Sequence, residues 1–272
     1  MAIKLIALDL DGTLLSSDHL TVPDINMCAI EEAIERGIGV VLATGRTLYD
    51  IPIELRTHPG IRYAVTSNGA ALVDLAEERT LFSSSIPSET AQAVIAAAQT
   101  GRVYAEIYSG GKAYIDQKMR SKSLEESLLF ILFTLLPQRY DTENLIDFLR
   151  QHQEPVEKIE LLTDDIDLAA AMADRLCALP VTVTTSGMNS VEVTNLNTCK
   201  ARALEQLCGL LNVQAADVLA IGDSMNDAEM LAWAGVAVAV ENADEKLKKI
   251  ADFISASNDE GGVALAIERF TK

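Results

Sequence analysis

Polar side chains able to bind a metal ion or a phosphate group follow four short apolar runs of the sequence. These four clusters are Asp9-Leu10-Asp11-Gly12-Thr13, Thr44-Gly45-Arg46, Ser67-Asn68-Gly69 and Gly222-Asp223-Ser224-Met225-Asn226-Asp227. If each apolar run is a strand of one parallel sheet, the clusters follow the carboxyl ends of the strands, where open α/β sheets bind their ligands. We therefore expect residues from the two ends of the chain to meet in one site.

Carboxylates dominate this expected site. Asp9 and Asp11 are spaced so that both can point into one site from a strand end, and Asp223 and Asp227 follow the fourth apolar run. Crowded carboxylates repel one another unless a hard cation lies between them, and oxygen ligands favour Mg²⁺. The sequence therefore predicts a magnesium site, whose charge also screens an incoming phosphate group from the acidic side chains.

This set of residues suits phosphoryl transfer. With a cation present, one carboxylate is free to attack phosphorus and form an aspartyl phosphate, and a second, protonated carboxyl group can donate a proton to the leaving alcohol. Lys200 lies near the expected start of a helix, where its ammonium group and the backbone amides can both face phosphate oxygens.

Several of these residues also have purely structural explanations. Asp227 can cap the helix that follows it without binding a metal, and Thr44 can be a helix N-cap. Lys200 taken alone would be a solvated helix lysine, and Asn68-Gly69 an ordinary turn. The residue types leave these alternatives open.

The first and last parts of the chain alternate between short apolar runs and helix-like segments. Strands are expected at residues 3–8, 38–43, 63–66, 217–221, 236–240 and 253–255, and helices at residues 22–36, 198–211, 225–233 and 262–270. Strands that alternate with helices predict right-handed βαβ units, and hence a doubly wound α/β domain with a parallel sheet.

The middle of the chain has a different pattern, with hairpin signals beside helices. Helices are expected at residues 88–98 and 166–178, strands at 103–108, 112–115, 157–162, 181–185 and 190–193, and hairpin turns at 109–111 and 187–189. This pattern predicts an antiparallel sheet with helices on one face. We expect a separate α+β domain over residues 84–191, inserted into a core made of residues 1–83 and 192–272.

The charge and composition of the chain limit the kinds of partner that it is expected to bind. The 272 residues carry a formal net charge of −18, which argues against nonspecific binding to nucleic acid or to an anionic membrane. The longest apolar run, residues 128–136, is far shorter than the ~20 residues that span a bilayer, and we interpret it as core or interface. Four cysteines without a pairing pattern, and a start without signal-peptide layout, favour a reduced, cytoplasmic compartment.

Together, the clusters resemble the motifs of the haloacid dehalogenase-like superfamily, specifically its Cof-type sugar-phosphatase branch with a large (type IIB) cap. The similar segments are DLDGT at residues 9–13, ATGR at 43–46, GDSMND at 222–227, AGVAVAVENA at 234–243 and SNDEGGVA at 257–264. The branch usually has Asn-Lys-Gly at its third motif, where this sequence has Cys199-Lys200-Ala201 and so keeps the lysine.

The resemblance implies a role for each motif residue. Asp9 would be the nucleophile and a metal ligand, Asp11 the general acid/base with its main-chain carbonyl on the metal, and Asp223 the third protein ligand of Mg²⁺. The residues implied to hold the phosphoryl group or to lie near the substrate are Leu10 through its amide, Thr44, Gly45, Arg46, Asn68, Lys200 and Asn226. The family's cap would close over the site and supply contacts to the leaving group.

These observations lead to one main hypothesis and two alternatives. The main hypothesis is a Mg²⁺-dependent phosphatase that hydrolyses small phosphomonoesters, such as sugar phosphates, as a monomer or weak homodimer. The same scaffold is used by phosphomutases, which return the phosphoryl group to the sugar. A non-enzymatic sensor of phosphorylated ligands is the second alternative, although a sensor needs neither a nucleophile nor a proton donor.

Overall fold

The computed structural model describes the chain except for residues 1, 99–102, 117–138, 152–154 and 187–189. The chain divides into two compact units: a core unit of Met1–Gly45, Ile51–Phe82 and Cys199–Lys272, and a second unit of Arg46–Asp50 and Ser83–Thr198. The apolar run at residues 128–136 and the hairpin turn expected at 187–189 lie outside the described residues.

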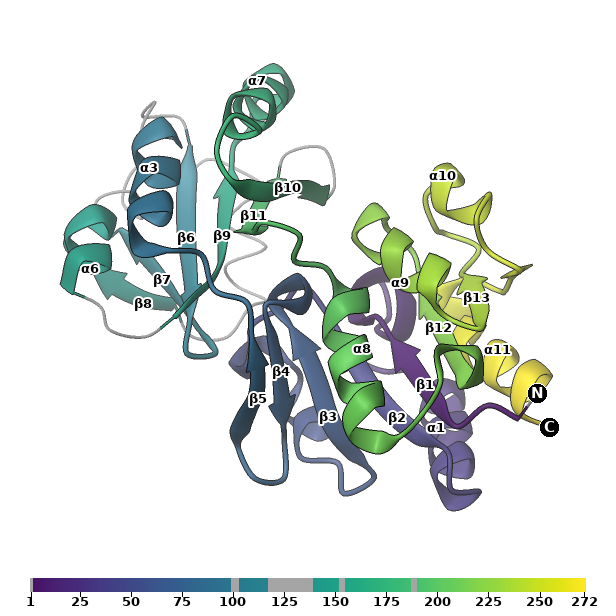
Figure 1. Ribbon diagram of the computed structural model, residues 1–272. Helices are drawn as coiled ribbons and strands as arrows, with labels where there is room; N and C mark the ends of the chain where they lie inside the picture. Colours follow the sequence, from purple (N-terminus) through teal and green to yellow (C-terminus); the bar gives the residue numbers. More distant parts are fainter. Residues whose placement is uncertain (1, 99–102, 117–138, 152–154, 187–189) are drawn as a thin grey trace. The chain divides into compact units, whose positions relative to one another are not determined.

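An eight-stranded sheet forms the centre of the core unit (Figure 1). Its strands are β1 (Leu5–Leu8), β2 (Gly39–Ala43), β3 (Ile61–Thr66), β4 (Ala71–Asp74), β5 (Arg79–Ser83), β12 (Val218–Gly222), β13 (Val236–Ala239) and β14 (Phe253–Ile254). Their order is β14-β13-β12-β1-β2-β3-β4-β5. The strands from β14 to β3 pair in parallel, as the alternating pattern predicts.

The register of the parallel strands brings the expected clusters to one edge. Leu8, the last residue of β1, pairs with Ile221 on one side and Leu42 on the other. The chain therefore leaves β1, β12 and β2 side by side. All four side chains of β1 are buried, because helices cover both faces of a doubly wound sheet.

The helices of the core unit form two layers. They are α1 (Asp24–Glu35), α2 (Ile53–Arg56), α8 (Lys200–Leu211), α9 (Ala228–Trp233), α10 (Glu245–Lys248) and α11 (Gly262–Thr271). Figure 1 shows α8 and α9 over one face of the sheet, and α1 packs with α11 over the other. The predicted doubly wound α/β core is confirmed.

The strands β4 and β5 are an addition that the alternating pattern missed. The strand β4 pairs antiparallel with β3, with Tyr63 opposite Asp74. Residues 75–78 connect β4 to β5, and so short a link leaves no room for a helix. The edge of the core sheet beyond β3 is therefore antiparallel.

A six-stranded sheet forms the second unit, in the order β10-β11-β9-β6-β7-β8. Its strands are β6 (Tyr104–Ser109), β7 (Lys112–Asp116), β8 (Arg139–Thr142), β9 (Val156–Leu162), β10 (Val181–Ser186) and β11 (Ser190–Asn195). The two predicted hairpins, β6–β7 and β10–β11, are antiparallel as expected. The pairing of β7 with β8 is parallel, which corrects the expectation of a purely antiparallel sheet; the chain between them is long enough for a crossover.

The two faces of this second sheet differ sharply. Helices α3 (Ser88–Ala98), α6 (Leu145–Gln151) and α7 (Ile166–Leu176) contribute to a hydrophobic cluster with alternate residues of the strands, such as Ile107, Ile159 and Val193. The intervening residues of the same strands are polar and buried: Glu106 on β6 and Lys158 on β9 are each 2% exposed. This arrangement agrees with the predicted α+β unit that has its helices on one face.

Residues 46–50 belong to the second unit, although only Thr44 and Gly45 separate them from β2 of the core in sequence. The amide of Tyr49 donates to the carbonyl of Gly111 at 3.2 Å. Arg139 of β8 donates from Nη1 to Asp50 Oδ1 at 2.9 Å, and both side chains are buried. Arg139 also donates from Nε to Glu106 Oε1 at 2.9 Å, so an ion-pair network fixes this segment to the second sheet.

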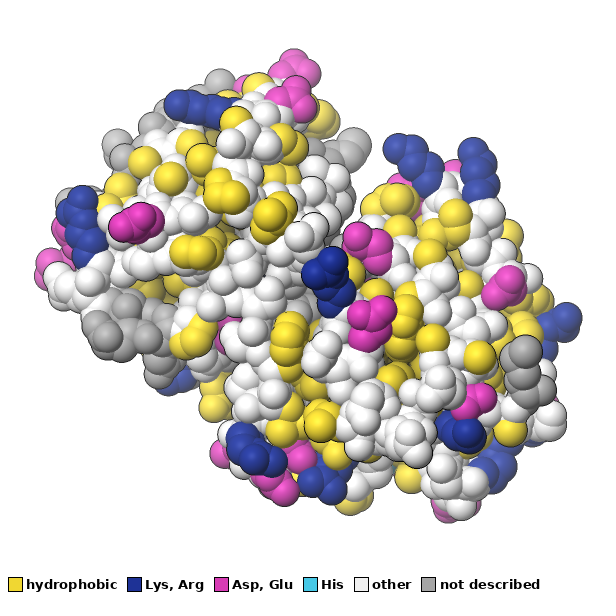
Figure 2. Space-filling model, viewed as in Figure 1, with side chains coloured by type: hydrophobic (Ala, Val, Ile, Leu, Met, Phe, Trp, Pro, Cys, Tyr) yellow, Lys and Arg dark blue, Asp and Glu magenta, His cyan; other side chains and the backbone are white. Residues whose placement is uncertain are grey.

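Acidic and basic side chains lie interspersed over the visible surface of each unit (Figure 2). Within the described part of the chain, no helix has both the length and the apolar composition needed to cross a membrane.

Candidate active site

Asp9 lies directly beyond the end of β1, in the middle of the core sheet. Its amide donates to the carbonyl of Ile221 at 3.0 Å, and its side chain is almost wholly buried. The chain then makes an irregular turn over Leu10–Leu14. Gly12 has a φ of 75° in this turn, a left-handed value that glycine adopts without the strain of a side chain.

The Gly-Thr pair of this turn holds Asp223, which arrives from the end of β12. A Cβ atom on Gly12 would lie 2.6 Å from Asp223 Oδ2, so only glycine permits this approach. Thr13 donates from Oγ1 to Asp223 Oδ1 at 2.8 Å. The contact of these two residues with Asp223 was not predicted from the sequence.

Lys200 lies between two carboxylates at the first turn of α8. Its Nζ donates to Asp9 Oδ1 at 2.6 Å and to Asp227 Oδ1 at 2.6 Å, and its side chain has no exposed surface. A lysine is buried in this way only when charged partners compensate its lost hydration. Lys200 is therefore not a solvated helix lysine.

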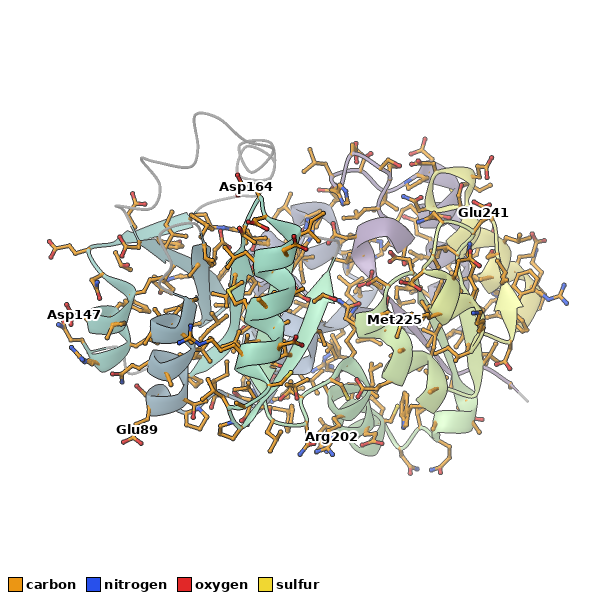
Figure 3. All side chains as sticks on the ribbon, turned by 90° about the horizontal axis from the view of Figure 1, so that it is seen from above. Glu89, Asp147, Asp164, Arg202, Met225 and Glu241 are labelled. Atoms are coloured by element: carbon orange, nitrogen blue, oxygen red, sulfur yellow. The ribbon has the colours of Figure 1, made fainter. Side chains whose placement is uncertain are left out.

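Asp227 forms the cap that the sequence allowed and also an ion pair with Lys200. Its Oδ2 accepts hydrogen bonds from the amides of Asp223 at 3.1 Å and Ser224 at 3.2 Å, which is a capping arrangement with Ser224. Its Oδ1 accepts from Lys200. Asp227 thus fixes both the turn that presents Asp223 and the ammonium group beside Asp9. Figure 3 marks Met225 in this turn and Arg202 two residues beyond Lys200.

The turn after β3 is tied to the same group. Gly69 has a φ of 96°, and a Cβ atom there would lie 2.2 Å from the carbonyl oxygen of Cys199, so this turn packs against the start of α8. The amide of Asn68 donates to the carbonyl of Thr44 at 3.1 Å, and Asn226 Nδ2 donates to Asn68 Oδ1 at 3.2 Å. Asn68-Gly69 is therefore more than an isolated turn.

The carboxylates of Asp9, Asp223 and Asp227 each offer an oxygen within 4.8 Å of the others. Burial, and then the charge of Asp227, raise the pKa of Asp9 well above its usual range and that of Asp223 to about 6. Burial opposes the charge on Lys200, but Asp227 and Asp9 more than offset it and raise the lysine pKa. One ammonium group does not neutralise three carboxylates. A hard divalent cation fits this set of oxygen donors.

The profile of the haloacid dehalogenase-like hydrolase family matches residues 6–267 of this chain. The chain belongs to this family. This hydrolase is 30% identical to the phosphatase YwpJ of Bacillus subtilis (strain 168) over 96% of its own length and 97% of YwpJ. It is 28% identical to the 5-amino-6-(5-phospho-D-ribitylamino)uracil phosphatase YwtE of the same organism, over 98% and 97% of the two chains.

Solved structures agree with this assignment. A haloacid dehalogenase-like hydrolase from B. subtilis superposes with a TM-score of 0.85 at 29% identity, over 98% of this chain and 99% of the other. The subclass IIB sugar phosphatase BT4131 shares the fold, with a TM-score of 0.83 at 22% identity over 98% of each chain. The family expected from the motifs is confirmed, and this hydrolase is a phosphoric monoester hydrolase.

The other residues of this hydrolase that were predicted to bind phosphate or substrate do not all lie in one cluster. Thr44 follows β2 and is fully buried, with its amide donating to the carbonyl of Val65 at 2.9 Å; Gly45 follows it. Leu10 is buried, and its carbonyl accepts from the amide of Leu15 at 2.9 Å. Arg46 belongs to the second unit, where its Nη1 donates to the carbonyl of Asp50 at 2.9 Å.

The carboxylate of Asp11 is not one of the three that cluster among the described residues. Its Oδ1 lies 2.9 Å from Nδ1 of His19, a residue for which the sequence indicated no role. No periodicity or motif spacing in residues 14–21 signals this contact.

Proposed function

We propose that this chain is a Mg²⁺-dependent phosphatase that hydrolyses small phosphomonoesters, such as sugar phosphates, through an aspartyl phosphate on Asp9. The observation that carries the proposal is the position of Asp9: buried at a strand end, 2.6 Å from Lys200 Nζ and grouped with Asp223 and Asp227. A buried carboxylate at a strand end, with an ammonium group and two further carboxylates close by, suits attack on phosphorus.

The proposed reaction has two half-reactions. In the first, an oxygen of Asp9 attacks phosphorus, the bond from phosphorus to the ester oxygen breaks, and Asp11 gives its proton to the departing alcohol. In the second, Asp11 takes a proton from water as that water attacks the phosphorus of the aspartyl phosphate, which releases inorganic phosphate and restores Asp9.

The other residues would bind and orient the phosphoryl group. Asp9, Asp223 and the main-chain carbonyl of Asp11 would hold Mg²⁺, with Asp227 beside them through its contact with Lys200. When bound, the cation would neutralise charge on the phosphoryl oxygens. We assign the phosphoryl group to Lys200, Thr44, Asn226 and the amide of Leu10, and contacts nearer the substrate to Gly45, Arg46 and Asn68.

The second unit is proposed as the cap that determines substrate choice. Among the described residues, the face of its sheet opposite α3, α6 and α7 carries buried charged groups that a purely structural sheet would not need. Lys158 donates to Glu192 at 2.6 Å, and Tyr108 donates to Glu160 at 2.5 Å. Fixed charges of this kind suit recognition of a hydroxyl-rich leaving group by hydrogen bonds.

The test is phosphate release from a panel of sugar, nucleotide and cofactor phosphates, with and without Mg²⁺. The panel includes 5-amino-6-(5-phospho-D-ribitylamino)uracil, because a similar protein, YwtE, bears that name. Mg²⁺-dependent release, with labelled phosphate trapped on the wild-type protein by acid quench and absent from Asp9→Asn, supports the proposal. An isomerised sugar phosphate without net phosphate release would instead indicate a mutase, and tight binding without turnover a sensor.

A further inference from the structure

Residues 16–21 form a compact loop directly after the turn that carries Asp11. The amide of Ser16 donates to the carbonyl of Thr21 at 2.8 Å, and the amide of His19 donates to the carbonyl of Ser16 at 2.9 Å. Asp18 Oδ1 accepts from the amides of Leu20 at 2.8 Å and Thr21 at 2.9 Å. The loop therefore has a defined backbone conformation of its own.

The SNDEGG segment near the C-terminus anchors this loop from outside. Asp259 accepts hydrogen bonds from both the amide and the hydroxyl group of Ser17, the former at 2.9 Å. Asn258 donates from Nδ2 to the carbonyl of Leu15 at 2.9 Å. From the sequence, this segment showed only a resemblance to the family, with no role of its own. The contacts show that it fixes the chain on both sides of Ser16.

His19 stands on this anchored loop in a left-handed conformation, with φ 58°. Its Nδ1 lies 2.9 Å from Oδ1 of Asp11, and the two side chains are 53% and 38% exposed. A half-exposed carboxylate without such a contact would exchange among several rotamers. The contact is thus the means by which the loop can restrict the orientation of Asp11.

We propose that His19 is a positioning residue, which holds the carboxyl group of Asp11 in the orientation needed for proton transfer. The proposal rests on the role of Asp11 as general acid/base proposed above. An imidazole nitrogen can donate to a carboxylate in one tautomer and accept from a carboxylic acid in the other, so the contact is compatible with both half-reactions.

Two substitutions separate this role from a backbone effect. Asparagine and glycine both tolerate a left-handed conformation, so His19→Asn and His19→Gly leave the loop unstrained. Asparagine places an amide nitrogen where histidine has Nδ1, whereas glycine removes the contact. The readout is kcat/KM on a sugar phosphate and on p-nitrophenyl phosphate, whose leaving group departs without protonation.

We expect His19→Gly to lower kcat/KM on the sugar phosphate by roughly tenfold or more, within the ~10²–10⁴ that proton transfer contributes. The loss on p-nitrophenyl phosphate should be much smaller, and His19→Asn should recover most of the sugar-phosphate activity. Unchanged kinetics in His19→Gly, or an equal loss on both substrates that asparagine does not rescue, would overturn the proposal.

A second readout does not depend on turnover. In the wild-type protein, the ¹⁵N resonance of His19 Nδ1 should shift on Asp11→Asn substitution, because its partner changes from a carboxyl group to an amide. An unshifted resonance contradicts the contact. If the wild-type protein releases no phosphate from any ester while this resonance does shift, the proposed function has failed and the contact between His19 and Asp11 stands.

Discussion

Lys200 Nζ lies 2.6 Å from Asp9 Oδ1 and 2.6 Å from Asp227 Oδ1, with no exposed surface on the lysine side chain. This one side chain joins the expected nucleophile at the end of β1 to the turn after β12. Charge compensation and the relative position of two motifs therefore depend on the same ammonium group.

Replacing Lys200 by methionine should therefore cost both activity and stability. The change leaves two buried carboxylates without their cation, and breaking a buried pair in this way costs about 3–5 kcal/mol. We expect turnover to fall by roughly 10²-fold or more, in line with the loss of a preorganised charge beside the reacting group. Phosphate release and thermal unfolding measure the two effects.

Lys4 provides the control for that substitution. It also makes a 2.6 Å ion pair, with Asp217, but its side chain is 58% exposed. Surface pairs contribute little to stability, so Lys4→Met should unfold at nearly the wild-type temperature and keep full activity. Equal losses in the two variants would mean that burial of Lys200 is not what matters.

Substituting alanine for Gly12 and for Gly209 should have opposite effects on stability. Gly12→Ala would place a Cβ atom 2.6 Å from Asp223 Oδ2 at a φ of 75°, so it should displace Asp223 and reduce both activity and stability. Gly209 lies inside α8 with nothing within 4 Å of its Cβ position. Gly209→Ala should instead stabilise the protein by about 0.5–1 kcal/mol without loss of activity. Denaturant titration and phosphate release distinguish the two.

Removal of divalent cations should abolish phosphate release, and adding Mg²⁺ should restore it. Because a ligand of the folded state stabilises that state, saturation at a hundred times the dissociation constant should add about 2.7 kcal/mol to the free energy of unfolding. Asp223→Asn should lose most of this Mg²⁺-dependent increase in melting temperature. A full increase in that variant would exclude Asp223 as a ligand.

Two glutamates that pair across β6 and β9 should give opposite dependences of stability on pH. Burial raises the pKa of Glu106 to about 7, so the stability that it contributes is present below pH 4.5 and is lost as the pH rises through 7. Glu106→Gln should therefore remove up to about 3 kcal/mol of the decline in stability between pH 5 and pH 8.

Glu160 is the matched residue, and its pKa is shifted in the opposite direction. Burial raises its pKa, but Lys158 and other hydrogen-bond donors more than offset this and leave the pKa below its usual value. Its contribution is therefore present at neutral pH and disappears as the pH falls through the lowered pKa. Glu160→Gln should be destabilised at pH 7 and approach the wild type in acid; denaturation at several pH values compares the two variants.

Local signals in the sequence account for most elements and for the clustering of motifs. The helix at residues 88–98 has the predicted bounds, because its start and its apolar spacing are both explicit. The parallel pairing of β7 with β8 could not be predicted, since pairing direction over a long connection depends on tertiary contacts. The short β4 and β5 were missed because the alternating pattern favours a helix between strands.

Within the site, the sequence predicted which residues come together better than it predicted the contacts between their side chains. The sequence placed Asp9, Asp223 and Lys200 at element ends that the register brings together, which is a rule of topology. It could not show that Lys200 loses all exposure, or that Thr13 holds Asp223, because both follow from packing between distant segments. His19 was missed for a different reason: it lies close to Asp11 in sequence, but no periodicity or motif spacing signals the contact between their side chains.

The segment Arg46–Asp50 determines how the second unit could be exchanged between related proteins. A chimera that grafts only a foreign counterpart of residues 83–198 would separate Asp50 from Arg139, the partner on β8 that it meets in a buried ion pair. Transplanting both stretches together would preserve that pair. The unit that would have to be exchanged is therefore discontinuous in sequence, and its smaller piece begins immediately after Thr44 and Gly45.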